Sequence, residues 1–216
     1  MLLPLFHLVP LATLVAAALG AGPGTDNRSA LKCERSASEL VLNTGQSTVR
    51  WKGTKFLGLG KHEGTVRFAG GVICVRSGEV QHGWFEVDLR TIEVTDIPAH
   101  EPVPRQRLRN HLLGEDFFHV AAYPKARFVM RNVIREKEGL YRIGGTLSIR
   151  GRTHPITFYA RVSTLSSTSL QAEARVEIDR QRYGVSYRGS TLRDDLVDDR
   201  FQLDLAIVAQ ARQLGS

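Results

Sequence analysis

The sequence has few cysteines, few aromatic residues and only one long apolar run. Its 216 residues include two cysteines, Cys33 and Cys74, too few for the disulfide framework of a small coreless domain. Lys and Arg exceed Asp and Glu by 29 to 22, a formal net charge of +7. No basic run is interleaved with aromatic residues, which argues against nucleic-acid binding. The dispersed positive charge is typical of a solvated outer face, and it favours contact with anionic membranes or phosphorylated ligands.

Signatures of common catalytic and metal sites are also missing. The glycines around Lys61 lack the spacing of a phosphate-binding loop, and Ser190 lacks the flanking glycines of a hydrolase nucleophile. Histidines outside residues 1–22 show no metal-ligand spacing, and the acidic residues 194–199 have too few regularly spaced oxygens for a calcium loop. We therefore expect no metal, no cofactor and no enzymatic activity.

The one long apolar run is residues 1–22, which predict a secretory signal peptide. Small residues follow the apolar core, as a cleavage site requires, but no Lys or Arg follows Met1. A misassigned start and an uncleaved anchor are therefore the alternatives. Residues 23–46 lack a clear period and are interpreted as a linker. An exported chain permits a disulfide between Cys33 and Cys74, with two unpaired thiols as the alternative.

Most of the remaining chain alternates between apolar and polar residues, the pattern of strands with one buried face. Glycine pairs and short polar runs separate the segments, so we interpret Gly70 and Gly71 as a turn. The pattern predicts about eight strands in an all-β antiparallel barrel or sandwich. The predicted strand segments are residues 48–54, 65–69, 72–76, 79–89, 126–133, 141–149, 156–162, 170–178 and 201–209.

A stretch without this alternation interrupts the strands. Residues 98–124 carry apolar side chains at helix-like spacing, including the adjacent Phe117 and Phe118, and predict a short helical or looping insert that lies on an apolar surface such as a barrel end. His111, near Glu115 and Asp116, is the residue most open to a catalytic interpretation. A catalytic histidine needs a nucleophile and a polar pocket, and the sequence indicates neither. We expect His111 to hold the insert by hydrogen bonds to the backbone or to Asp116.

Several motifs in the same order resemble one known family, the YceI-like proteins, which are periplasmic polyisoprenoid-binding proteins with a lipocalin-like barrel. Each motif is weak alone, but together they cover about 160 residues in the family's order. They are residues 47–53 (STVRWKG), 62–66 (HEGTV), 85–89 (FEVDL), the insert from Leu108 to Phe128, 145–153 (GTLSIRGRT) and 179–185 (DRQRYGV).

The resemblance implies a lipocalin-like barrel over residues 47–211 that binds rather than catalyses. The implied ligand is a polyisoprenoid, an isoprenoid quinone or a fatty-acid-like lipid, and the implied location is the periplasm or the exterior. The protein would be a monomer or homodimer that touches membranes transiently. The predicted lumen residues are Trp51, Phe68, Phe85, Leu89, Phe117, Phe118, Phe128, Met130, Leu147, Ile149, Phe158 and Phe201.

The same inward residues permit a second interpretation. They could meet across the barrel axis and fill it, which would indicate a structural or stress-related interaction protein. About eight strands enclose a space that side chains can fill or that holds one slender ligand. The pattern alone favours a filled core, whereas the resemblance favours a tunnel. A continuous apolar cavity would decide for the lipid-binding interpretation.

Overall fold

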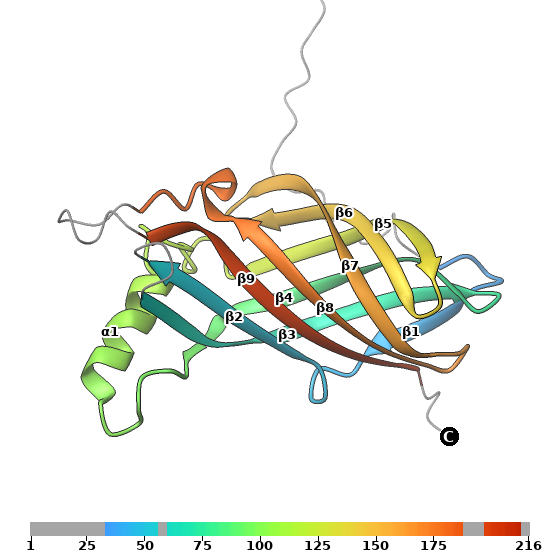
Figure 1. Cartoon of the computed structure of the whole chain (residues 1–216), viewed down its shortest axis with the longest axis horizontal. Coiled ribbons are helices and arrows are strands. Elements are labelled where there is room, and N and C mark those ends of the chain that lie inside the picture. Colours follow the sequence, from blue (N-terminus) through green and yellow to red (C-terminus); the bar gives the residue numbers. More distant parts are fainter. Residues whose placement is uncertain (1–32, 56–59, 188–196, 213–216) are drawn as a thin grey trace, which may run out of the picture. The chain divides into compact units, whose positions relative to one another are not determined.

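The strands of the computed structural model close into an antiparallel barrel that carries one α-helix at one end (Figure 1). The structure describes residues 33–55, 60–187 and 197–212, so the predicted signal peptide and the first part of the predicted linker lie outside it. The elements are β1 (Ser38–Leu42), β2 (Thr48–Lys55), β3 (Gly60–Arg76), β4 (Glu79–Val94), α1 (Pro102–Leu113), β5 (Lys125–Lys137), β6 (Leu140–Ile149), β7 (Arg152–Leu165), β8 (Ser169–Asp179), the 3₁₀ helix η2 (Arg180–Tyr183) and β9 (Val197–Ala211).

Nine strands form the sheet, but they occupy eight positions around the barrel. Neighbours from β2 to β9 pair in chain order, and β2 pairs with β9 to close the ring. The short β1 lies in line with β2, between the same two neighbours: Leu40 is opposite Ile73 of β3, and Leu42 is opposite Ala209 of β9. The predicted all-β antiparallel barrel with about eight strands is therefore confirmed.

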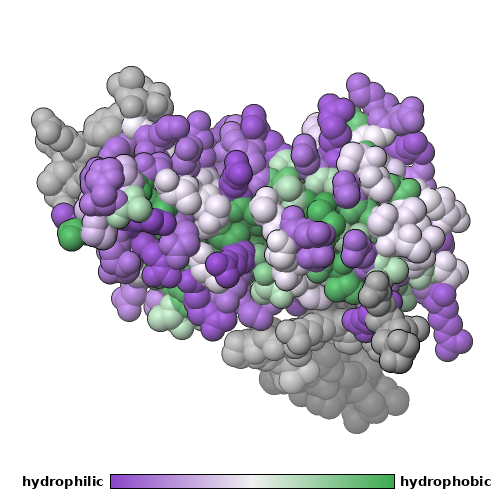
Figure 2. Space-filling view, turned by 90° about the horizontal axis from the view of Figure 1, so that it is seen from below, coloured by the Kyte–Doolittle hydropathy of each residue, from purple (hydrophilic) through white to green (hydrophobic). Residues whose placement is uncertain are grey.

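Alternation along each strand separates the two faces of this sheet. In β4, Phe85 and Leu89 line the barrel interior, and Glu86 on the opposite face pairs with Lys125 at 2.6 Å. Hydrophilic residues predominate on the face of the barrel in Figure 2, with apolar residues visible between them. Each strand thus buries one face, as the period of two predicts. No helix among the described residues has the length and hydropathy needed to cross a membrane.

The predicted linker is wrong for its last part, because residues 38–42 are strand β1. Leu40 and Leu42 point inward and are buried, while a disulfide joins Cys33 to Cys74 of β3, with their Cα atoms 5.4 Å apart. The alternation of Leu40 and Leu42 was a signal for a strand. It is only five residues long, and so short a period is hard to distinguish from a polar linker with two leucines.

The predicted turn at Gly70 and Gly71 is also wrong, because β3 runs through it without interruption. A Cβ atom at Gly71 would lie 2.7 Å from Cδ1 of Phe85 on the neighbouring strand. Glycine is needed there because the aromatic ring packs against the backbone, and the chain does not turn. The sheet has a register shift between Phe68 and Gly70, which is the bend that the two glycines accompany.

The predicted insert is confirmed as α1 and the loops around it. Pro102 occupies the first turn, where a missing N–H costs nothing, and Gly114 follows the last helical residue. Leu108 and Leu112, four positions apart, share one helix face and border the barrel interior. The helix therefore lies against the end of the barrel where β4 ends and β5 begins.

Candidate functional site

The barrel encloses a cavity of about 410 Å³ that is lined almost entirely by apolar side chains. All eight positions of the ring contribute to its wall, and α1 with the following loop covers one end. On β9 alone, the wall residues run from Val197 to Ile207. This volume falls within the range of small-molecule sites in proteins. The interior is thus hollow.

The structure places every predicted lumen residue on the wall of this cavity. They are Trp51, Phe68, Phe85, Leu89, Phe117, Phe118, Phe128, Met130, Leu147, Ile149, Phe158 and Phe201. Their inward direction follows from the strand period, and their part in binding a ligand stays a prediction. The wall also includes the small residues Ala160, Ala172 and Ala174, which the alternation had placed inward too.

Glycines opposite large aromatic residues help to keep the bore open. A Cβ atom at Gly64 would lie 2.6 Å from the ring of Trp51, its partner on the neighbouring strand. A Cβ atom at Gly145 would lie 2.7 Å from two atoms of the Phe128 ring. Both rings therefore lie against the backbone of the adjacent strand instead of extending toward the axis. Space that the rings would otherwise occupy remains free.

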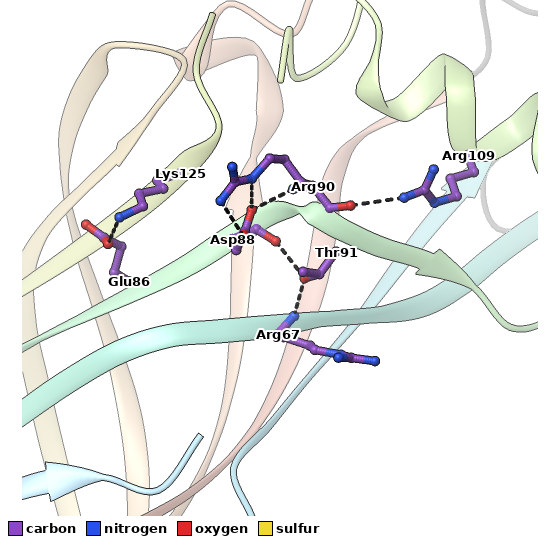
Figure 3. Close-up of polar contacts among 7 residues, drawn as sticks. All are labelled: Arg67, Glu86, Asp88, Arg90, Thr91, Arg109 and Lys125. Carbon is purple, nitrogen blue, oxygen red and sulfur yellow. Dashed lines mark hydrogen bonds and ion pairs between the residues drawn. The ribbon is translucent and has the colours of Figure 1, made fainter. Parts of the chain in front are cut away.

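The helix α1 is fixed to β4 by an arginine that binds backbone carbonyls. Arg109 donates from Nε to the carbonyl of Ile92 at 2.8 Å. It also donates from Nη2 to the carbonyl of Arg90 at 3.0 Å (Figure 3). At this point β4 bulges away from β3. The Thr91 hydroxyl accepts the otherwise unpaired N–H of Arg67 at 2.9 Å, as Figure 3 also shows. The bulge exposes the carbonyls that Arg109 uses.

A bidentate ion pair stabilises the same bulge. Arg90 donates from Nε and Nη2 to the two carboxylate oxygens of Asp88, each at 2.8 Å (Figure 3). These hydrogen bonds, helped by the charge of Lys125, lower the pKa of Asp88. The carboxylate therefore stays ionised, and the bulge keeps its shape, well below neutral pH.

The loop after α1 is fixed to the opposite side of the barrel end. Arg150 donates from Nη1 to the carbonyl of Phe117 at 2.8 Å and to the carbonyl of Gly184 at 2.7 Å. The rings of Phe117 and Phe118 meet edge to face, with centroids 4.9 Å apart, and Phe118 approaches Phe201 of β9 at 6.3 Å. The paired phenylalanines thus pack the insert onto the barrel.

His111 is part of this aromatic packing. Its ring lies edge-on to Phe117 at 5.6 Å and to Tyr187 at 4.3 Å between centroids, and it borders the cavity. Asp116, the predicted alternative to a backbone partner, is exposed at the surface. The aromatic contacts agree with a structural part for His111, whereas a bond to Asp116 stays a prediction.

Most polar residues of the cavity wall lie at the end covered by α1, and Glu173 in the middle of β8 is the exception. At the α1 end, Arg180 is 4 % exposed, and its guanidinium donates to four backbone carbonyls and to the carboxylate of Asp199 at 3.3 Å. Those carbonyls belong to Val185, Tyr187, Val197 and Asp198, at 2.7 to 3.1 Å. Because it satisfies so many buried carbonyls, Arg180 holds η2 and the following turn against the start of β9.

Other polar groups surround this end of the cavity, and the sequence interpretation had not selected them. Thr54 donates its hydroxyl to the carboxylate of Asp198, and Lys55 lies beside them on the wall. His62 pairs through Nδ1 with Asp96 at 2.8 Å and also borders the cavity. The family motif of residues 62–66 (HEGTV) contains His62, but it did not identify this polar site. Among the described residues, no three His, Cys, Asp or Glu side chains form a metal-ligand cluster.

Comparison with known proteins agrees with this geometry. The family model described as the YceI-like domain matches residues 40–209. Among solved structures, BcnA of Burkholderia cenocepacia superposes with a TM-score of 0.65 and 18 % identity, covering 78 % of this chain and 99 % of its own. A structure from Saccharophagus degradans, titled a polyisoprenoid binding domain, superposes with a TM-score of 0.57 and 16 % identity, covering 82 % and 99 %.

A third similar structure is the YceI protein of Campylobacter jejuni. Its TM-score is 0.52 with 20 % identity, over 63 % of this chain and 76 % of that one. No protein with a curated description matches the chain significantly. At these identities the superpositions establish a shared fold.

Proposed function

The chain belongs to the YceI-like domain family, and we propose that it binds the hydrocarbon tail of a long-chain amphiphile inside its barrel. The observation that carries this proposal is the apolar cavity of about 410 Å³, which is continuous along the barrel and has most of its polar lining residues at the α1 end. Family membership and the neighbour titled a polyisoprenoid binding domain support a lipid as the ligand. The tail is an isoprenoid chain, that of an isoprenoid quinone, or an acyl chain.

The apolar area available is sufficient for useful affinity. A tail that buries about 300 Å² of apolar surface gains about 7 kcal/mol at ~25 cal/mol per Å². This corresponds to a Kd of about 10 µM before the costs of ordering the ligand are included. Contacts of the head group with Lys55 or His62 at the mouth supply the remainder. We assign no catalytic step to these residues, and the protein sequesters or carries its ligand unchanged.

We further propose that the protein acts outside the cytoplasm, in the periplasm or after secretion. The apolar residues 1–22 and the disulfide between Cys33 and Cys74 support export, because disulfides persist in oxidising compartments. The net charge of +7 favours transient contact with anionic membrane surfaces, where such a protein would load and release lipid.

Native mass spectrometry with lipid extraction tests the proposal. The purified protein is expected to retain an amphiphile or to take one up on titration. Ala174→Phe places a ring on the cavity wall at the middle of β8 and is expected to abolish retention. Gln171→Phe adds the same ring to the exposed face of the same strand and is expected to retain the ligand.

Two outcomes of this experiment would contradict the proposal. If the barrel never retains an amphiphile, from cells or by titration, the structural or interaction protein becomes the better interpretation. If both variants retain the ligand equally, the ligand is bound outside the cavity.

A further inference from the structure

We propose that the bore is closed at the end opposite α1, so that it measures the length of the tail and admits about 20 backbone carbons. This inference rests on the proposed function, and it names the class of ligand by tail length. A longer tail must leave its additional carbons in water at the mouth of the bore, and these carbons add no affinity.

Five inward side chains form the closed end, which we call the stopper: Leu40, Leu42, Val75, Tyr141 and Ala209. Their exposures are 0, 5, 2, 4 and 0 %, and none of them borders the cavity. On their strands, Val75 and Ala209 each lie one inward position beyond a cavity residue, Ile73 and Ile207 respectively. Their burial leaves these side chains out of contact with both the solvent and the cavity, and this observation indicates a closed end.

Strand β1 supplies the two leucines of the stopper. It continues the position of β2 around the barrel after a turn at residues 43–47, so Leu40 and Leu42 stand where a longer β2 would have extended the bore. The disulfide from Cys33 to Cys74 fixes the chain just before β1. The stopper is thus covalently attached to the barrel wall.

The polar end of the cavity determines which way a ligand enters. Lys55, His62 and Asp198 border the cavity at the α1 end, whereas the stopper presents only apolar atoms and the phenol of Tyr141, whose hydroxyl donates to Glu79 at 3.3 Å. A polar head is therefore stabilised at the α1 end, and the tail points toward the stopper.

The strands give the length of the bore. From Val197 to Ile207, β9 advances ten residues along the cavity wall, about 33 Å at ~3.3 Å per residue. Barrel strands tilt by about 40°, so this corresponds to about 25 Å along the axis. With carbon–carbon bonds of about 1.5 Å, an extended chain advances roughly 1.25 Å per carbon, and about 20 carbons fill the bore. For an isoprenoid, with four backbone carbons in each unit, a limit of about 20 backbone carbons corresponds to about five units.

Binding of linear fatty acids of increasing length tests the stopper. Acids from about 10 to about 26 carbons, delivered from cyclodextrin, compete with a fluorescent acyl probe. Affinity is expected to rise roughly three- to fourfold for each added methylene and to stop rising near 20 carbons. Ala172→Leu, between the deep wall residues Val162 and Ile207, is expected to move this break to shorter acids. Gln171→Leu, exposed on the same strand, is expected to leave it unchanged.

The outcomes separate the two proposals. If no acid of any length binds, the length limit for linear tails is refuted, and if native mass spectrometry also finds no retained amphiphile, the proposed function is wrong as well. If acids bind but the affinity keeps rising beyond about 24 carbons, the far end is open and only the stopper is refuted. The stopper is equally refuted if both variants break at the same length as the natural protein.

Discussion

Reduction of the Cys33–Cys74 disulfide is expected to lower the free energy of unfolding by about 4 kcal/mol. The cross-link joins residues that are 41 positions apart. In the chain-entropy description, a loop of this size restricts the unfolded chain by about 13 cal/mol/K, or about 4 kcal/mol at room temperature. This is a large part of the 5–15 kcal/mol that typically stabilises a domain. The bond therefore matters for the whole barrel as well as for β1.

Urea unfolding of the oxidised and the reduced natural protein measures this term directly. Both samples keep the same side chains, so the buried site of Cys74 stays filled and only the covalent bond changes. With a urea dependence of about 2 kcal/mol/M, the unfolding midpoint should fall by about 2 M on reduction. The double variant Cys33→Ala with Cys74→Ala is expected to lose somewhat more, because a cavity forms at position 74. A change below about 1 kcal/mol in the reduced protein would refute this reasoning.

Three further predictions concern single side chains. Tyr183→Phe should stabilise the protein by about 1 kcal/mol at neutral pH, since the buried hydroxyl has no hydrogen-bond partner among the described residues. Burial raises the pKa of Tyr183, so the natural protein loses stability as the pH rises above about 10. Urea titrations at pH 7 and 11 should therefore show that the variant's advantage in unfolding free energy grows with pH. Gly145→Ala should cost about 1–3 kcal/mol by overpacking, because the added Cβ would meet the carbonyl oxygen of Val129 and would lie 2.7 Å from the Phe128 ring. The control is Gly53→Ala, whose Cβ meets no atom within 4 Å. Arg109→Met should loosen α1 and speed ligand release, measured by stopped flow, whereas Arg107→Met, on the exposed face of α1, should not.

The barrel could be predicted because its signal is local. Alternation along a strand assigns each side chain to one face of the sheet. All ten of the predicted lumen residues that lie on strands border the cavity. The errors arose where the conformation of a residue is determined by a partner that is distant in the sequence. Gly71 is a glycine because Phe85 packs on it from β4, and β1 is a strand because β3 and β9 pair with its five residues. Neither fact is encoded within a few residues of the site.

The polar residues at the α1 end of the cavity also could not be predicted from local sequence patterns. His62 belongs to one of the family motifs, but its partner Asp96 is 34 residues away at the end of the next strand. Arg180 binds the carbonyls of Val185 and Val197, which are 12 positions apart, and the sequence identifies only the motif around Arg180. Side chains that satisfy backbone carbonyls leave no periodic pattern, so they can be assigned only when the turn geometry is known.

Whether the bore is hollow depends on register, which explains why alternation alone favoured a filled core. Large inward rings fill an eight-stranded barrel if each extends toward the axis. Here Trp51 stands directly opposite Gly64, and the Phe128 ring lies over Gly145 of the neighbouring strand. Each ring rests on a backbone that has no side chain, so its volume is accommodated in the wall. A Cβ atom at either glycine would meet the ring and, at a still shorter distance, a backbone carbonyl oxygen of a neighbouring strand, that of Glu93 at Gly64 and that of Val129 at Gly145. Pairing aromatic residues with glycines across strands therefore lets the rings lie in the wall, and the hollow interior depends on it.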